Sequence, residues 1–263
     1  MSGHIVFAHA NGIPGGSYQA VGEVLQAASY TWSAIDRLGH DPAYPPGPWR
    51  RLAEELIAHV QSTATTPVHL VGHSMGAVAS FIAAWRRPEL FQSLVMLDPP
   101  LIMGASSGLY AMAQWLGQID RLTPAGRSVH RRRVWPDRDA ARAYFASKPL
   151  YAGFDPASFA AFFEHAIERR EDAQWHLRFD PDVEVELFRH TPYDWMCYWG
   201  RLKVPGFIVR GRQSLVTRRS YAQTLARRHG LSYREQAGAH MFPLEDSLAC
   251  AQMLVELLAA AAH

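Results

Sequence analysis

A serine set between two glycines and a distant histidine are the residues of this sequence best suited to chemistry. Ser74 lies in the run Gly72-His73-Ser74-Met75-Gly76, and His240 lies in Ala-Gly-Ala-His-Met-Phe-Pro near the end of the chain. A serine hydroxyl becomes a strong nucleophile when a neutral imidazole accepts its proton, and the imidazole can return that proton to a leaving group. These residues predict a nucleophilic serine with a histidine general base.

The chain on either side of Ser74 has the pattern of a strand followed by a helix. Residues 68–71 form an apolar strand-like run, and residues 75–86 are apolar nearly all round, as in a buried helix. A serine at such a turn adopts a strained, positive-φ conformation that raises its hydroxyl above the sheet. Glycines on both sides let strand and helix approach closely. This context disfavours the alternative of an idle serine in a glycine-rich turn.

With this motif the sequence resembles the α/β-hydrolase superfamily, in the family's element order over nearly the whole chain. It is most similar to bacterial hydrolases whose first strand enters a His-Ala-Asn-Gly loop and whose second ends in Asp-Arg-x-Gly-His-Asp. Here these are His9-Ala10-Asn11-Gly12 and residues 36–41. By this resemblance, the main-chain N–H groups of Asn11 and Met75 form an oxyanion hole. Ala10 replaces a more usual glycine, and His9 is interpreted as a structural residue of the loop.

The resemblance also assigns the general base to His240. It follows the last expected strand and precedes the last helix, and Phe242-Pro243 after it resembles the family's histidine loop. A position in a loop lets the imidazole reach Ser74 from a separate rigid element.

The triad acid is missing from its usual place. Most relatives carry it in a Gly-x-x-Asp stretch after the next-to-last strand, but here Ser214 and Leu215 occupy the expected positions. Asp98 ends the strand after the nucleophile helix and keeps the chain order serine, acid, histidine, so we predict that it is the acid. The alternatives are a purely structural Asp98 and an acid at Asp194. Asp36 is interpreted as structural.

The rest of the chain must supply a scaffold for these residues. Short apolar runs alternate with helical patterns, which predicts an α/β fold with a parallel sheet flanked by helices. The expected strands are residues 4–8, 30–35, 68–71, 94–97, 207–209 and 231–236. Only one precedes the oxyanion loop. We therefore expect an α/β-hydrolase fold of about six parallel strands, without the family's first two strands and with right-handed crossovers. By the resemblance, the spatial order of the strands is second, first, third, fourth, fifth, sixth.

Residues 101–200 interrupt the alternation, and by the resemblance they form a helical cap inserted after the fourth strand. Residues 1–100 and 201–263 then form the hydrolase core. The aromatic residues of the cap are interpreted mainly as its own core, with a substrate pocket as the alternative. The Arg131–Arg133 run is interpreted as a solvated helix face, in preference to a site for an anionic partner such as a carrier-protein thioester.

Composition excludes several other classes of protein. The 263 residues are 48% apolar and 19% charged, which is typical of a globular protein, and a net charge of +2 does not indicate a nucleic-acid partner. Cys197 and Cys250 are read as free thiols, and no zinc spacing occurs, so no metal or cofactor is expected. No signal peptide is evident, and the apolar run 254–262 is too short to span a bilayer. We expect a cytoplasmic protein.

The predicted function is hydrolysis of a small to medium, apolar carboxylic ester through an acyl-enzyme on Ser74. The serine excludes the dehalogenase and epoxide-hydrolase branches of the fold, which need aspartate at that position. A lyase or a thioesterase on the same fold, and a ligand-binding receptor that retains the triad, remain as alternatives. The acyl length and the oligomeric state stay open.

Overall fold

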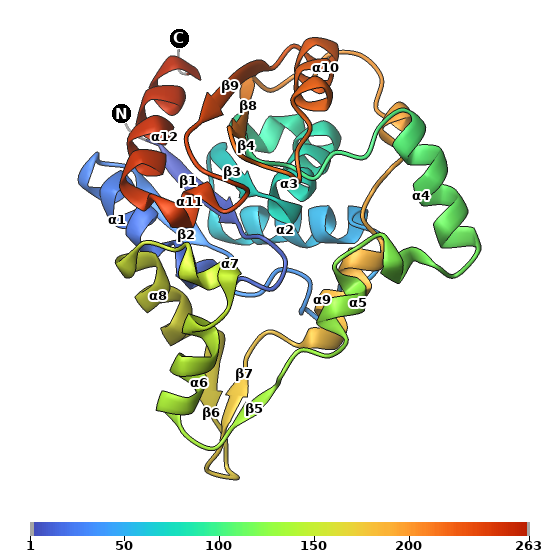
Figure 1. Ribbon diagram of the computed structural model, residues 1–263. Coiled ribbons are helices and arrows are strands. Elements are labelled where there is room, and N and C mark those ends of the chain that lie inside the picture. The colour runs from blue at the N-terminus through green and yellow to red at the C-terminus, as the bar shows by residue number, and fades with distance from the viewer. Residues whose placement is uncertain (1–2, 262–263) are drawn as a thin grey trace.

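A parallel sheet of six strands forms the centre of the computed structural model, which describes residues 3–261 and, at Met196, the main chain alone. The order is β2-β1-β3-β4-β8-β9, as predicted (Figure 1). Every neighbouring pair is parallel. Within the described residues no strand precedes β1. The strands are β1 His4–Ala8, β2 Thr31–Ala34, β3 Val68–His73, β4 Phe91–Leu97, β8 Gly206–Gly211 and β9 Ser232–Gln236.

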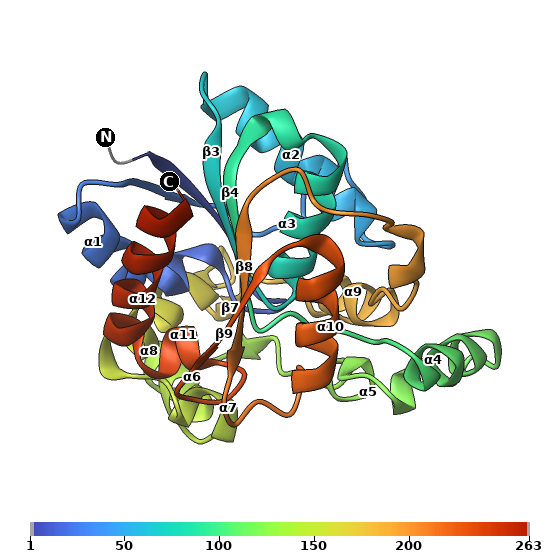
Figure 2. The same ribbon diagram turned by 90° about the horizontal axis from the view of Figure 1, so that it is seen from above.

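Helices cover both faces of this sheet (Figure 2). One face carries α1 and α12, and the other carries α2, α3 and α10. Successive residues of a strand point to opposite faces. In β1, accordingly, Val6 and Ala8 pack into the core on the α3 side, whereas Ile5 and Phe7 pack into the core on the α12 side. The helices are α1 Gln19–Ala27, α2 Arg50–Thr63, α3 Met75–Arg86, α10 Arg219–His229 and α12 Ser247–Ala261.

The segment between β4 and β8 forms an insertion below the carboxyl ends of the strands in Figure 1. It contains a small antiparallel sheet, ordered β5-β7-β6, that the sequence did not predict. These strands have only two or three residues, too few to show a period of two. The elements are α4 Ala105–Trp115, α5 Ala125–Ser128, β5 Val134–Trp135, α6 Arg138–Ala146, α7 Pro149–Ala152, α8 Pro156–Ala166, β6 Ile167–Arg169, β7 Trp175–Leu177 and α9 Pro181–Arg189.

Most aromatic side chains of the insertion are packed in an apolar core. Trp135, Phe145, Phe162 and Phe163 are at most 1% exposed, and Phe162 stacks on Tyr151. These residues therefore stabilise the insertion instead of lining an open pocket, which agrees with the preferred interpretation from the sequence. Among the described helices, none is long and apolar enough to cross a membrane.

The Arg131–Arg133 run differs from its prediction. It lies outside any helix, in the connection between α5 and β5. Arg132 and Arg133 are exposed, but the Arg131 side chain is only 12% exposed and forms an ion pair with Glu184 of α9. The solvated-helix interpretation was therefore wrong for Arg131. The burial of Arg131 depends on which part of the insertion folds over it, and a run of arginines in the sequence does not predict that contact.

Candidate active site

Ser74 occupies the sharp turn between β3 and α3, with φ 54° and ψ −116°. Its N–H donates to the carbonyl oxygen of Leu97 at 2.9 Å, which anchors the turn to β4. A side chain at either flanking glycine would meet main-chain atoms. A Cβ on Gly72 would collide with the carbonyl of Gly76, and one on Gly76 with that of Ala8. The strained turn and the need for both glycines agree with the interpretation of this motif as a nucleophile elbow.

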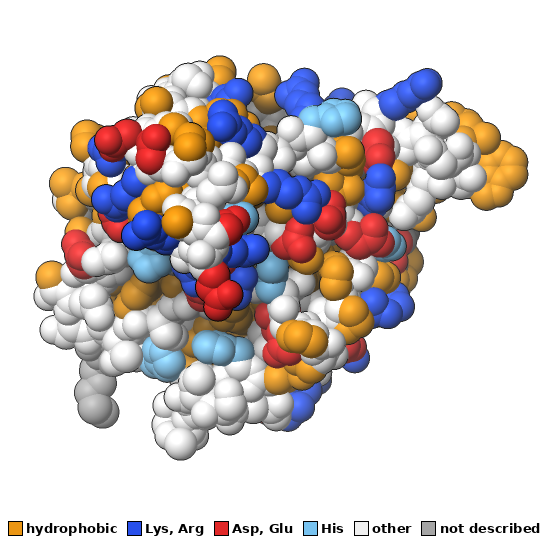
Figure 3. Space-filling view, turned by 90° about the horizontal axis from the view of Figure 1, so that it is seen from below, with side chains coloured by type: hydrophobic (Ala, Val, Ile, Leu, Met, Phe, Trp, Pro, Cys, Tyr) orange, Lys and Arg blue, Asp and Glu red, His pale blue; other side chains and the backbone are white. Residues whose placement is uncertain are grey.

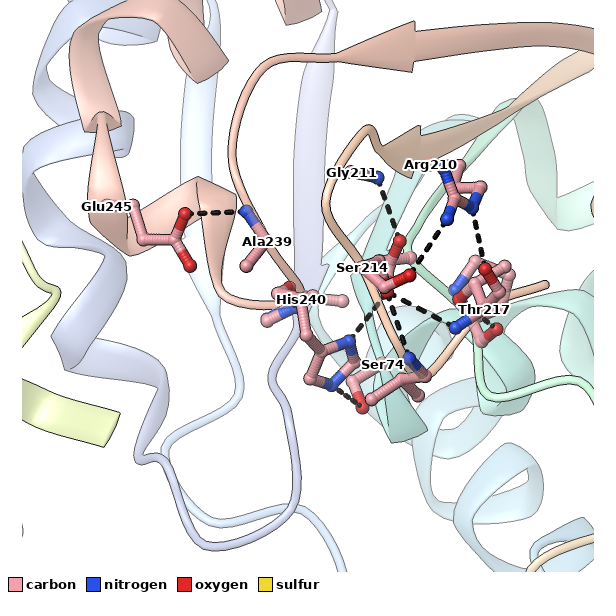
Figure 4. A network of polar contacts seen from close by, with 12 residues as sticks. Ser74, Arg210, Gly211, Ser214, Thr217, Ala239, His240 and Glu245 are labelled. Atoms are coloured by element: carbon pink, nitrogen blue, oxygen red, sulfur yellow. Dashed lines mark hydrogen bonds and ion pairs between the residues drawn. The ribbon is translucent and has the colours of Figure 1, made fainter. Parts of the chain in front are cut away.

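The structure brings Ser74, His240 and Asp98 together in one hydrogen-bonded line. His240 Nε2 lies 3.0 Å from Ser74 Oγ, and His240 Nδ1 lies 2.7 Å from Asp98 Oδ2 (Figure 4). A carboxylate accepts hydrogen bonds, so Nδ1–H donates to Asp98 and the Nε2 lone pair faces the serine hydroxyl. Glu245 holds the histidine loop by accepting the Ala239 N–H at 2.7 Å (Figure 4).

Asp98 is fully buried at the end of β4, with φ 43°. Besides His240, its carboxylate accepts the Gly211 N–H at 2.8 Å and the Ser214 hydroxyl at 2.5 Å. Ser214, at one of the two positions where the resemblance led us to expect the acid, therefore donates to the carboxylate of Asp98. In the sequence, position 214 could be described only as lacking the expected acid. The sequence contained no signal that the serine would support Asp98.

The other candidate acids lie elsewhere. Asp194 is exposed, and its carboxylate lies 3.8 Å from the Cys197 sulfur. Asp36 pairs with Arg178 of the insertion at 2.7 Å, which agrees with its interpretation as structural. Of the carboxylates considered, Asp98 alone is bonded to the imidazole of His240 among the described residues.

His9, the first residue of the oxyanion loop, is completely buried. Its Nε2 accepts the Leu38 N–H at 2.7 Å, so Nδ1–H donates to the Ala10 carbonyl at 2.8 Å. Burial lowers the pKa of His9 to about 4. The ring is therefore neutral and has both nitrogens occupied, and it acts as a structural support for the loop.

The two predicted oxyanion donors lie on segments that are bonded to each other. The Gly76 N–H donates to the His9 carbonyl at 3.1 Å and joins the start of α3 to the oxyanion loop. Met75 is the first residue of α3, where main-chain N–H groups have no helical acceptor. Asn11 donates its side-chain amide to the carbonyl of Glu184 at 2.9 Å.

A second polar chain, which the sequence did not reveal, links the oxyanion loop to His240. His73 Nε2–H donates to the His240 carbonyl at 2.9 Å, so its Nδ1 accepts the Tyr18 hydroxyl at 2.7 Å. The Tyr18 oxygen in turn lies 3.3 Å from the Ala10 N–H. Burial lowers the pKa of His73 well below its usual value, so the ring stays neutral in this network.

Known proteins share this fold and parts of this sequence. Over 111 residues the chain is 26% identical to the monoglyceride lipase of Rattus norvegicus, covering 39% of this chain and 37% of the lipase. Over 136 residues it is 29% identical to a type I acyl-CoA thioesterase of Penicillium roqueforti, covering 51% of this chain and 29% of that protein. The chain thus matches less than two-fifths of the length of these curated relatives.

Among solved structures, E-2-(acetamidomethylene)succinate hydrolase superposes with a TM-score of 0.74 and 19% identity, over 98% of this chain and 92% of that one. At this identity the superposition shows the shared fold. The model of the alpha/beta hydrolase family matches residues 5–253, nearly the whole chain. With the six-stranded parallel sheet and the strained serine turn, this match shows that the chain belongs to the alpha/beta hydrolase family.

Proposed function

We propose that this protein hydrolyses small to medium, apolar carboxylic esters through an acyl-enzyme on Ser74. The observation that carries the proposal is the line from Ser74 Oγ through the His240 imidazole to the buried Asp98 carboxylate. A serine in this arrangement can lose its proton to the imidazole as it attacks a carbonyl carbon.

The proposed reaction uses these three residues as follows. Ser74 Oγ attacks the ester carbonyl while His240 Nε2 takes the hydroxyl proton. The N–H groups of Asn11 and Met75 hold the negative oxygen of the tetrahedral intermediate. The intermediate collapses, and His240 gives the proton to the departing alcohol. Water then attacks the acyl-enzyme by the same route, with His240 as base, and the acid is released.

Two other parts of the chain have proposed roles. Asp98 holds the imidazole in the tautomer with Nε2 free and stabilises the imidazolium that forms during attack. Residues 101–200 act as a cap over the core formed by residues 1–100 and 201–263.

Thioester hydrolysis is the second candidate, because the thioesterase from Penicillium roqueforti is 29% identical over 136 residues. The proposed chemistry is the same, with a thiolate as the leaving group in place of an alkoxide. The rat relative, named a monoglyceride lipase, supports the oxygen ester.

The test is a panel of p-nitrophenyl esters and matched acyl thioesters, graded by acyl length, with wild-type protein and Ser74→Ala. We expect turnover of at least one short or medium ester, and its loss in Ser74→Ala. A preference for thioesters over esters of equal acyl length would favour the second candidate. Tight binding without turnover would indicate a receptor, and no acyl transfer from any member would contradict the proposal.

A further inference from the structure

A buried ion pair of the insertion lies directly on the oxyanion loop. Gly12 follows Asn11 with φ +74°, and a Cβ built on it would lie 2.8 Å from Arg131 Nη1 and 2.9 Å from Glu184 Cδ. The same Glu184 accepts the Asn11 side-chain amide through its main-chain carbonyl. Glu184 and Arg131 therefore contact two consecutive residues of the loop that carries a proposed oxyanion donor.

The polar side chains around this pair are hydrogen-bonded to it. Glu184 is 5% exposed. One of its oxygens accepts the Ser128 hydroxyl at 2.7 Å, and the other accepts the Arg131 guanidinium. Arg131 Nη2 donates to the Tyr151 hydroxyl at 2.8 Å. Three separate segments of the insertion, around α5, α7 and α9, thus meet at this pair beside Gly12, and Figure 1 shows α5 beside α9.

Two other ion pairs of the insertion lie at the surface. Figure 3 shows basic and acidic side chains mixed over the underside of the molecule, where the insertion lies. In the pairs Arg133–Asp182 and Arg138–Glu164, each side chain is at least 44% exposed. Exposed pairs of this kind contribute little to stability. A buried pair must offset the desolvation of both charges, so it is weak evidence of a stabilising role.

We propose that the Glu184–Arg131 pair positions the oxyanion loop, so that the insertion sets the geometry of the oxyanion hole. The inference rests on the proposed function, because it assigns a role in stabilising the tetrahedral intermediate. The side chains of the pair lie against Gly12, and the main-chain carbonyl of Glu184 accepts the Asn11 side-chain amide. Within the loop, His9 holds the Ala10 carbonyl. Loss of the pair lets the Asn11 N–H move relative to the Met75 N–H.

The test is Glu184→Gln in the full chain, with turnover counted per active site titrated to completion with a fluorophosphonate. A misplacement of about 1 Å can cost about 10² in rate, and loss of one oxyanion donor about 10²–10³. We expect kcat to fall by about 10–100-fold at nearly unchanged KM. An alkylboronic acid places an oxygen in the same hole, so its Kd should rise in parallel.

A second variant separates positioning from an unpaired buried charge. Arg131→Met combined with Glu184→Met removes both charges, a change that folded proteins often tolerate. We expect this protein to fold and to remain slow with weakened boronate binding. The matched control is Asp120→Asn, which breaks an ion pair with Arg189 on the same helix α9. Asp120→Asn should leave kcat and boronate affinity within about twofold.

The inference is overturned if the folded Glu184 and double variants keep wild-type kcat and boronate affinity, with only a lower melting temperature. Failure of the proposed function looks different, since the wild-type protein itself would then neither turn over esters nor react with the fluorophosphonate.

Discussion

The carboxylate of Asp98 is held by three donors, two from the end of β8 and the turn that follows it and one from the histidine loop. They are the Gly211 N–H, the Ser214 hydroxyl and His240 Nδ1. A fully buried carboxylate is costly unless such donors compensate it, and hydrogen bonds to a charged acceptor are the strong ones. This environment keeps Asp98 fixed beside the imidazole.

Asp98→Asn should lower turnover per titrated active site by about 10⁴-fold, because an amide no longer selects the correct imidazole tautomer. Turnover and melting temperature are measured together on the same preparation. Adding Ser214→Asp should restore part of the activity, since position 214 lies beside Asp98. A folded Asp98→Asn protein with near-normal turnover would show that Asp98 is structural.

Glu55 of α2 should make the stability of the protein depend on pH. The side chain is 8% exposed and accepts the Gly39 N–H at 2.8 Å. Burial raises its pKa from 4.5 to about 7. The folded state thus favours the protonated acid, and this contribution to stability is complete below pH 4.5 and is lost as the pH rises through 7.

Glu55→Gln should remove this dependence. We expect the melting temperature of Glu55→Gln to rise relative to that of the wild type as the pH increases from 5 to 8. The change corresponds to at most about 3 kcal/mol in the free energy of unfolding. Thermal unfolding at a series of pH values measures the difference. Glu54→Gln, on the same helix but in the surface pair with Arg86, is the control and should follow the wild-type curve. A constant offset between Glu55→Gln and wild type across this range would refute the assignment.

At the scale of elements, the strand–helix junction at Ser74 depends on contact between main chains. Gly76 lies against the Ala8 carbonyl of β1, and its N–H donates to the His9 carbonyl. Because the neighbouring atoms are backbone, no side-chain rotation can make room for a methyl group. The junction therefore constrains the nucleophile and the oxyanion loop together.

Gly76→Ala should destabilise the protein by about 1–3 kcal/mol or more, or prevent folding, since overpacking of a rigid site forces the backbone to shift. Gly108→Ala is the matched control. It also lies in a helix, α4, but a Cβ there meets nothing within 4 Å. Alanine at 108 should stabilise the protein by about 0.5–1 kcal/mol. Urea unfolding midpoints test both, and equal effects at the two positions would contradict the close packing of the elbow.

At the scale of the whole molecule, the parallel sheet could be predicted because most of its strands are short apolar runs that alternate with helical patterns, whereas the strand order came from the resemblance to the α/β-hydrolase superfamily. Ser74, His240 and Asp98 could be placed because each of them follows the carboxyl end of a parallel strand. The small sheet of the insertion could not, because its strands have two or three residues.

The residues that support the candidate site could not be predicted from the sequence either. Tyr18, Ser214, Arg131 and Glu184 acquire their roles from contacts between segments far apart in the chain. A tyrosine in a helix start or an arginine in a charged run has the same local pattern whether it is buried or exposed. Only the packing of distant segments against one another distinguishes these cases.

The central claim is that Ser74 carries the acyl group, and rapid acid quenching of the reaction with a p-nitrophenyl ester tests it most directly. Peptide mass spectrometry of the quenched protein should place one acyl group on Ser74, with a burst of p-nitrophenol equal to the enzyme concentration. In His240→Ala the acyl group should accumulate orders of magnitude more slowly. Acylation of another residue, or steady turnover with no acylated Ser74, would contradict the account.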